Sequence, residues 1–101
     1  MGKIELFKGV ISGTATSNLI YGRSDSGGRY QFSLKLDTMI EGIPEEFLVY
    51  AITRTGQMIL RKGDKVIIEG KLVKETMGKE ELEIIEMQAK HIYNSTLKCG
   101  F

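Results

Sequence analysis

The side chains of this chain that could take part in chemistry are mainly rings and cations. Histidine and cysteine occur once each, as His91 and Cys99, so they supply neither a metal cluster nor an internal disulfide. A group of carboxylates alternates roughly with apolar residues, as on a solvated strand face, and forms no evident acid and base pair: Glu80, Glu81, Glu83 and Glu86. We therefore predict that the protein is not an enzyme and has neither a metal site nor a cofactor.

Rings and positive charges suit binding instead. The 101 residues include four tyrosines, four phenylalanines and no tryptophan. Aromatic faces accept flat groups, and lysine and arginine attract anions. The formal net charge is only +1, so the distribution of charge is more informative than its sum.

Positive charge is concentrated in the middle of the chain. Residues 51–74 contain two acidic side chains, Asp64 and Glu69, and six basic ones: Arg54, Arg61, Lys62, Lys65, Lys71 and Lys74. From residue 75 onwards the acidic residues outnumber the basic ones. Either the central segment forms a basic face, or the two segments pair as neighbouring strands and much of the asymmetry cancels across the ladder.

Length and composition indicate one folded domain. The hydrophobic share of 42% and the charged share of 27% are those of an ordinary globular protein. No apolar stretch approaches the roughly 18 to 20 residues that a membrane span requires, and the N-terminus lacks the layout of a signal peptide, so we expect a cytoplasmic protein. We place the domain at residues 1–93 and a short, loosely ordered C-terminal tail at residues 94–101.

Glycines spread among β-branched and aromatic runs, with a single proline, predict five strands. The strands are expected at about 4–16, 29–38, 47–52, 65–74 and 81–93, with hairpin loops at 24–28 and 76–80 and a short helical turn at 55–62. Gly9 and Gly13 let the long first strand bend, and a slip in the apolar period at Ile84 and Ile85 predicts a bulge. Five strands with a connector between the third and the fourth favour an all-β, five-stranded Greek-key barrel.

The fourth predicted strand and its flanks carry a resemblance to a known family. The segment from Leu60 to Leu72, with the turn Lys62-Gly63-Asp64 before an alternating strand that reaches Glu69-Gly70, resembles the corresponding strand of OB-fold single-stranded DNA-binding proteins and of archaeal replication-protein-A-like OB domains. The runs 47–52 and 89–93 resemble the third and the closing strand of such domains. The resemblance, which spans roughly residues 10–93, implies an OB-fold that binds single-stranded nucleic acid.

The resemblance also indicates which positions should bind. OB-folds bind through their second and third strands and through the loops that join strands one to two and four to five. Single strands require rings for base stacking and cations along the backbone. The resulting candidates are Tyr21, Arg23, Arg29, Gln31, Ser33, Lys35, Phe47, Tyr50, Lys74, Met77 and Lys79.

The rings among these candidates have competing interpretations. In the alternating strand 29–38, Tyr30 and Phe32 fall on the side of the leucines, so we assign them to the core. Phe47 and Tyr50 lie on opposite faces of one strand, so at most one of them points into a binding groove. We expect Tyr21, which precedes a polar loop, to be exposed.

Two classes of function remain open on the sequence. The first is a module that binds single-stranded DNA or RNA. Because one small OB-fold offers few stacking sites, such a module could act as a homo-oligomer. The second is a structural OB-fold subunit that mediates protein–protein interaction in a replication or repair complex, which the near-neutral charge and the missing tryptophan allow.

Overall fold

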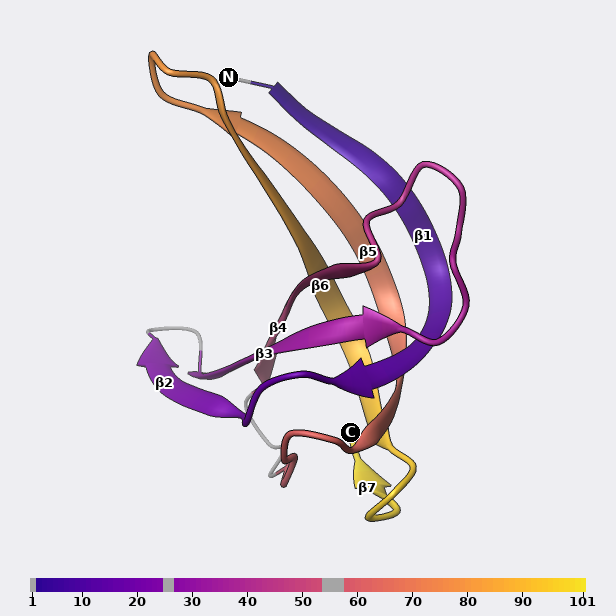
Figure 1. The fold of residues 1–101 in the computed structure, drawn as a ribbon. Coiled ribbons are helices and arrows are strands. Elements are labelled where there is room, and N and C mark those ends of the chain that lie inside the picture. Colours follow the sequence, from indigo (N-terminus) through magenta and orange to yellow (C-terminus); the bar gives the residue numbers. More distant parts are fainter. Residues whose placement is uncertain (1, 25–26, 54–57) are drawn as a thin grey trace.

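The computed structural model describes residues 2–24, 27–53 and 58–101, and these residues form strands and loops without a helix (Figure 1). None of the described residues therefore belongs to a helix that could cross a membrane. The strands are β1 (Gly2–Ala15), β2 (Ile20–Ser24), β3 (Gly27–Leu36), β4 (Glu46–Thr53), β5 (Lys65–Met77), β6 (Leu82–Asn94) and β7 (Cys99–Gly100).

Five of these strands close into a ring. β1 pairs with β5, β5 with β6, β6 with β4 in parallel, β4 with β3, and β3 returns to the end of β1. The closing pair brings Gly13 against Leu36, and a Cβ at Gly13 would lie 2.4 Å from the carbonyl oxygen of Lys35. The ring closes at this point because glycine lets the two backbones meet. This is the predicted all-β, five-stranded OB-fold barrel.

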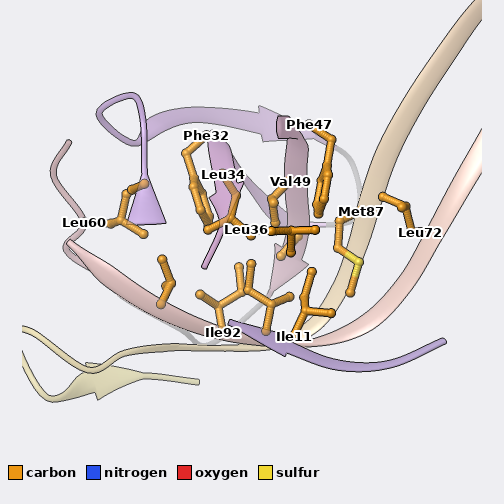
Figure 2. Packing of buried hydrophobic residues seen from close by; sticks show 14 of the residues in the cluster. Ile11, Phe32, Leu34, Leu36, Phe47, Val49, Leu60, Leu72, Met87 and Ile92 are labelled. Carbon is orange, nitrogen blue, oxygen red and sulfur yellow. The ribbon is translucent and has the colours of Figure 1, made fainter. Parts of the chain in front are cut away.

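Alternating side chains fill the inside of the ring. On β3 every second residue from Tyr30 is buried, and the intervening residues face outward, as the sequence pattern predicted. The core cluster takes side chains from all five ring strands, including Ile11, Phe32, Val49, Leu72 and Ile92, which pack together in Figure 2. The alternation therefore fixes which side chains face outward and remain accessible to a ligand.

β1, β5 and β6 extend beyond the ring as a three-stranded arm, which we define as residues 2–5 of β1 and 73–86 of β5, β6 and their turn. Figure 1 shows the hairpin of β5 and β6 curving away from β2, β3 and β4, with the N-terminus beside it. The pairing of β4 with β6 ends at Glu86, so in the arm the edge of β6 opposite β5 pairs with no described strand.

Bulges bend the strands, but not where the sequence predicted one. Register shifts place Leu6 as an extra residue on β1 and Lys90 as an extra residue on β6. The bulge expected at Ile84 and Ile85 is wrong, because residues 82–88 pair without interruption with residues 71–77. Both faces of the arm are partly exposed, so consecutive apolar residues can point to opposite sides without any break in pairing.

Two loops also differ from the sequence expectation. Residues 20–24 form β2, an additional strand that pairs with the start of β3. The helical turn expected at 55–62 falls partly on residues 54–57, which lie outside the described residues, and residues 58–62 contain no helix.

A buried polar cluster holds the end of the barrel together. Asn94 donates from Nδ2 to the Asp64 carboxylate at 2.8 Å and to the carbonyl of Ile59 at 3.0 Å. The same Asp64 carboxylate accepts the backbone N–H of Arg61 at 2.9 Å. These two donors hold the pKa of the Asp64 carboxyl below its usual range. The turn before β5 and the end of β6 are thereby fixed to each other.

The last residues of the chain, where the sequence predicted a tail, pair with the barrel. β7 pairs with the end of β6, and Phe101 exchanges two backbone hydrogen bonds with Ile92, at 3.0 and 3.2 Å. The Phe101 side chain packs against the core cluster. Residues 99–101 therefore extend the wall of the barrel beside β6.

Candidate nucleic-acid interface

The outward side of β3, β4 and β6 carries one ring in the middle of a polar surface. On β4, Phe47, Val49 and Ala51 are buried, and Tyr50 is on the opposite side, half-buried. In register, Tyr50 lies between Gln31 of β3 and Gln88 of β6. Cross-strand partners in a sheet point to the same face. Tyr50 therefore sits in a row of outward polar side chains.

Arg29 packs on this ring. Its Cζ atom lies 4.3 Å from the centroid of the Tyr50 ring, within the range of a cation–π interaction. Arg29 is itself on the outward side of β3, two residues before Gln31. The guanidinium restrains the orientation of the Tyr50 ring and brings a positive charge directly to it.

The hydroxyl of Tyr50 stays protonated at neutral pH. Burial raises its pKa above the ordinary value, and the negative charge of Glu86 raises it further. The positive charge of Arg29 and a hydrogen bond with the Gln88 side chain act in the opposite direction but are weaker. A neutral ring places no negative charge in the path of a polyanion, so this position suits stacking.

Phe47, the other ring proposed on β4, belongs to the core. Its side chain is 6% exposed and packs in the core cluster, where Figure 2 shows it among the buried side chains. Side chains of β4 point alternately into the core and outward, so Phe47 and Tyr50 lie on opposite faces, and Phe47 is the one that points into the core. The candidate set therefore loses Phe47 and keeps Tyr50 on this strand.

Ser33 and Lys35 continue the outward side of β3 toward an acidic end. The backbone N–H of Ser33 donates to the hydroxyl of Ser17 at 2.9 Å, which ties this part of β3 to the loop after β1. Lys35 forms an exposed ion pair with Glu45 at 3.4 Å, and it lies opposite Glu46 in register. The positive field of this surface is therefore stronger at the Arg29 end than at the Lys35 end.

Tyr21 and Arg23 lie on the other face of the β2–β3 hairpin. Tyr21 is paired with Tyr30, and the two ring centroids are 5.1 Å apart. Tyr30 faces away from Arg29 and Tyr50, so Tyr21 and Arg23 do so too. The ring of Tyr21 is nevertheless accessible, with 56% of the residue exposed. The structure does not bring the first-loop pair Tyr21 and Arg23 into one surface with Tyr50.

Lys74, Met77 and Lys79 belong to the arm. Lys74 forms an ion pair with Glu83 at 2.9 Å, Met77 is exposed at the end of β5, and Lys79 is exposed in the turn. Met77 pairs with Leu82, which is four residues from the end of the β4–β6 pairing at Glu86, or about 13 Å along a strand. These three candidates therefore lie apart from Tyr50.

Three lysines that are not among the predicted binding residues lie close together. Lys8, Lys71 and Lys90, from β1, β5 and β6, line a surface hollow of about 490 Å³ together with Glu69 and Gln88. Gln88, Lys71 and Lys8 are successive register partners, so they extend the row of Tyr50 around the outside of the barrel. Only the strand order brings these lysines together, and no spacing along the chain signals it. Alternation alone could have shown that Lys8 and Lys71 face outward.

Among the described residues, no group of three or more His, Cys, Asp or Glu side chains is placed to hold a metal ion. Cys99 is a free thiol whose Sγ lies 3.7 Å from the carbonyl oxygen of Ile59. The surface around Tyr50 offers one ring with a guanidinium on it, neutral hydrogen-bonding groups, lysines at one end of the row and the nearby carboxylate of Glu86.

No protein-family model and no curated protein matches this sequence. Among solved structures, the chain is similar to a small single-stranded DNA-binding protein from Streptomyces coelicolor, with a TM-score of 0.65 and 19% identity over 96% of this chain and 98% of that one. It is also similar to the second single-stranded DNA-binding protein from Mycobacterium smegmatis, with a TM-score of 0.63 and 17% identity over 92% of this chain and 94% of that one. At this level of identity the similarity shows a shared fold over almost the whole chain.

Proposed function

We propose that this chain binds single-stranded nucleic acid, DNA in the first place, by stacking bases on Tyr50 and placing phosphates near the cations around it. The observation that carries the proposal is the outward ring of Tyr50 with the Arg29 guanidinium 4.3 Å from its centroid. The structures with the same fold are, by name, single-stranded DNA-binding proteins, which supports this choice of ligand. The protein acts as a binding module rather than as an enzyme.

Tyr50 and the groups around it contact different parts of the bound strand in this proposal. A base that stacks on a ring gains about 1–3 kcal/mol, and stacking tolerates any base because every base has a flat face. Arg29 supplies a charge for the adjacent phosphate, and Gln31, Ser33 and Gln88 offer neutral hydrogen-bonding groups on the same side. Such a site holds unpaired strands with little sequence preference.

The cations of the arm form a second contact in this proposal. Lys74 and Lys79, with Met77 between them in sequence, lie beyond the reach of a base held at Tyr50. Lys74 pairs with Ile85 and points to the opposite face of the arm from Gln88 and Tyr50, so a strand that leaves the Tyr50 row along β6 would reach Lys79 in the turn. Lys74 already has Glu83 as a partner, so Lys79 is the stronger of the two cations.

Fluorescence anisotropy with labelled oligonucleotides of about 20 to 30 nucleotides, at two salt concentrations, tests the proposal. We expect Tyr50→Leu to weaken binding about 5- to 150-fold, which corresponds to the loss of one stacked base. Tyr93→Leu is the matched control, because Tyr93 is an exposed tyrosine of β6 that pairs with Ile67 and lies outside the row of Tyr50. The same measurement with RNA of the same sequence separates the two polymers.

Two results would overturn the proposal. The first is the absence of binding by the unaltered chain even at low salt, where phosphate contacts are strongest. The second is equal affinity of the Tyr50→Leu and Tyr93→Leu variants, since binding would then bypass the outward ring.

A second candidate function rests on the apolar residues of the arm. Met77, Leu82 and Ile84 share one face, and each is more than 40% exposed. In addition, residues 2–11 of β1 pair only with β5, so their other edge is open among the described residues. These features suit association with a second copy or with a protein of a replication or repair complex.

Light scattering on the purified chain separates the two functions. A stable oligomer that dissociates in a Leu82→Ser and Ile84→Ser double variant supports association through the arm. If that variant keeps its affinity for oligonucleotides, association and strand binding are independent. If the chain associates with protein but ignores nucleic acid, the second candidate replaces the first.

A further inference from the structure

We infer that the strand-binding surface continues over the edge of β2 to a second stacking platform, the ring of Tyr21, on the opposite face of the β2–β3 hairpin. The inference rests on the proposed function, because it assigns a second contact to the same ligand. Its ligand is an unpaired strand that is longer than the part held at Tyr50.

The ring of Tyr21 is held in place by packing contacts. Its centroid lies 5.1 Å from that of Tyr30, with the ring planes inclined by 50°. The Tyr30 ring is buried and lies in turn 6.2 Å from the ring of Phe101. One side of the Tyr21 ring therefore rests on a buried aromatic group, and much of the residue remains open to solvent.

The backbone of Gly28 provides the second packing contact for this ring. A Cβ atom at Gly28 would lie 2.5 Å from a ring carbon of Tyr21 and 2.9 Å from its hydroxyl oxygen. The backbone of Gly28 does not adopt a left-handed conformation, so the turn itself does not require glycine here. The residue type at position 28 instead lets the ring lie directly against the β3 backbone.

These contacts distinguish Tyr21 from a tyrosine that is exposed without a binding role. An exposed tyrosine in solution samples several rotamers, and ordering it on binding costs about 0.5–1.5 kcal/mol. The contacts with Tyr30 and Gly28 fix the ring in advance, so a base that stacks on it avoids most of that cost. Arg23, two residues further along β2, lies on the same face and brings a positive charge.

The hairpin geometry makes the two platforms reachable by one strand. β2 is the last strand of the sheet, and the far edge of β2 pairs with no described strand. Tyr21 and Tyr50 are two strands apart, about 10 Å across the sheet, and lie in adjacent rows on opposite faces. A flexible polymer can pass around this edge, with Arg29 near one ring and Arg23 near the other.

Oligonucleotide length separates the two platforms. We expect Tyr21→Leu to weaken binding of a 24-nucleotide oligothymidine about 5- to 150-fold and to leave unchanged the binding of a 3-nucleotide oligomer, which is too short to pass around the edge of β2. Gly28→Ala should weaken the longer complex in the same direction, because the added methyl group displaces the ring. Gly22→Ala is the matched control on the same hairpin, since a Cβ at Gly22 meets nothing within 4 Å.

A direct contact gives a readout that a structural role of Tyr21 would not produce. A 24-nucleotide oligomer with 5-iodouracil at successive positions should cross-link to Tyr21 on irradiation, as peptide masses would show. Tyr21→Phe should keep the affinity of the unaltered chain, because the ring is retained. Thermal unfolding of each variant confirms that it is folded before binding is compared.

The results distinguish failure of this inference from failure of the proposed function. If Tyr50→Leu weakens binding of both oligomers but Tyr21→Leu and Gly28→Ala bind the longer one normally, the second platform is wrong and the first stands. The absence of a cross-link at Tyr21 would overturn the inference as well. If Tyr50→Leu has no effect at either length, the proposed function itself fails.

Discussion

β5 passes through two regions of the molecule that have opposite physical character. In its first half, Val66 and Ile68 are fully buried in the barrel and alternate with exposed residues. In the arm, Val73 is the only buried residue of β5, and the strand has none from Lys74 to Met77. The arm part of β5 is also more polar, since Lys74, Glu75 and Thr76 precede Met77. The first part of the strand belongs to a closed ring, and the arm part belongs to one open sheet.

The difference separates stability from recognition. Closure buries one face of every ring strand and removes the free edges, which is where a small domain obtains its folding free energy. The arm leaves apolar groups, cations and the edge of β1 accessible. We therefore expect the barrel to determine whether the chain folds and the exposed surfaces to determine what it binds.

The largest expected effect comes from the same substitution in each region. Ile68→Ala should lower the free energy of unfolding by about 2–5 kcal/mol, because it leaves a cavity in a closed core. Ile84→Ala in the arm should lower it by less than about 0.5 kcal/mol, because that side chain is already 42% exposed. Urea unfolding followed by circular dichroism measures both.

An equally large loss for Ile84→Ala would break the comparison. It would mean that another surface covers the arm in solution, and the loss should then shrink as the protein is diluted. A small loss for Ile68→Ala would contradict the closed core itself.

Polar contacts should follow the same division with a smaller effect. Asn94→Ala removes the buried amide that donates to Asp64 and Ile59, and it should cost about 1–3 kcal/mol because these acceptors lose a partner. Lys74→Gln breaks the partly exposed ion pair with Glu83 on the arm and should cost no more than about 1 kcal/mol. A reversed order in urea unfolding would show that the arm, and not the end of the barrel, depends on its polar contacts.

The barrel was largely predictable from the sequence because a closed ring imposes strict alternation. The period of two on β3 identified its buried and outward residues, and the turn 62–64 identified the start of β5. The five strands and their Greek-key arrangement followed from this pattern.

The rest depends on contacts that alternation does not encode. β2 was missed because residues 20–24 form a strand only through pairing with β3. The bulge at Ile84 was misplaced because the arm has no buried face to enforce a period. The sequence showed that Phe47 and Tyr50 lie on opposite faces, but not which of the two points into the core. The proximity of Lys8, Lys71 and Lys90 could not be predicted without the order of three strands in the sheet.

Acid should weaken the barrel through Asp64. Hydrogen bonds from Arg61 and Asn94 lower its pKa in the folded state relative to about 3.9 in an unfolded chain. The stabilisation is therefore complete above the unfolded pKa and is lost as the pH falls through the lowered folded value. In urea unfolding between pH 6 and pH 2, Asp64→Asn should destabilise most at pH 6, and its difference from the unaltered chain should shrink toward pH 2. Glu83→Gln on the arm serves as the control, and an equal pH dependence in both variants would rule out a special role for Asp64.

The smallest effect concerns binding at the tip of the arm. Lys79→Gln removes an exposed cation that the proposed second contact uses, and it should leave the stability unchanged. If Lys79 neutralises one phosphate, the slope of log K against log salt for a 24-nucleotide strand should become shallower by about 0.7. Lys98→Gln, an exposed lysine beside β7 at the opposite end of the molecule in Figure 1, should leave that slope unchanged. Equal slopes for the two variants would restrict strand binding to the barrel, since the arm would then contribute no phosphate contact at Lys79.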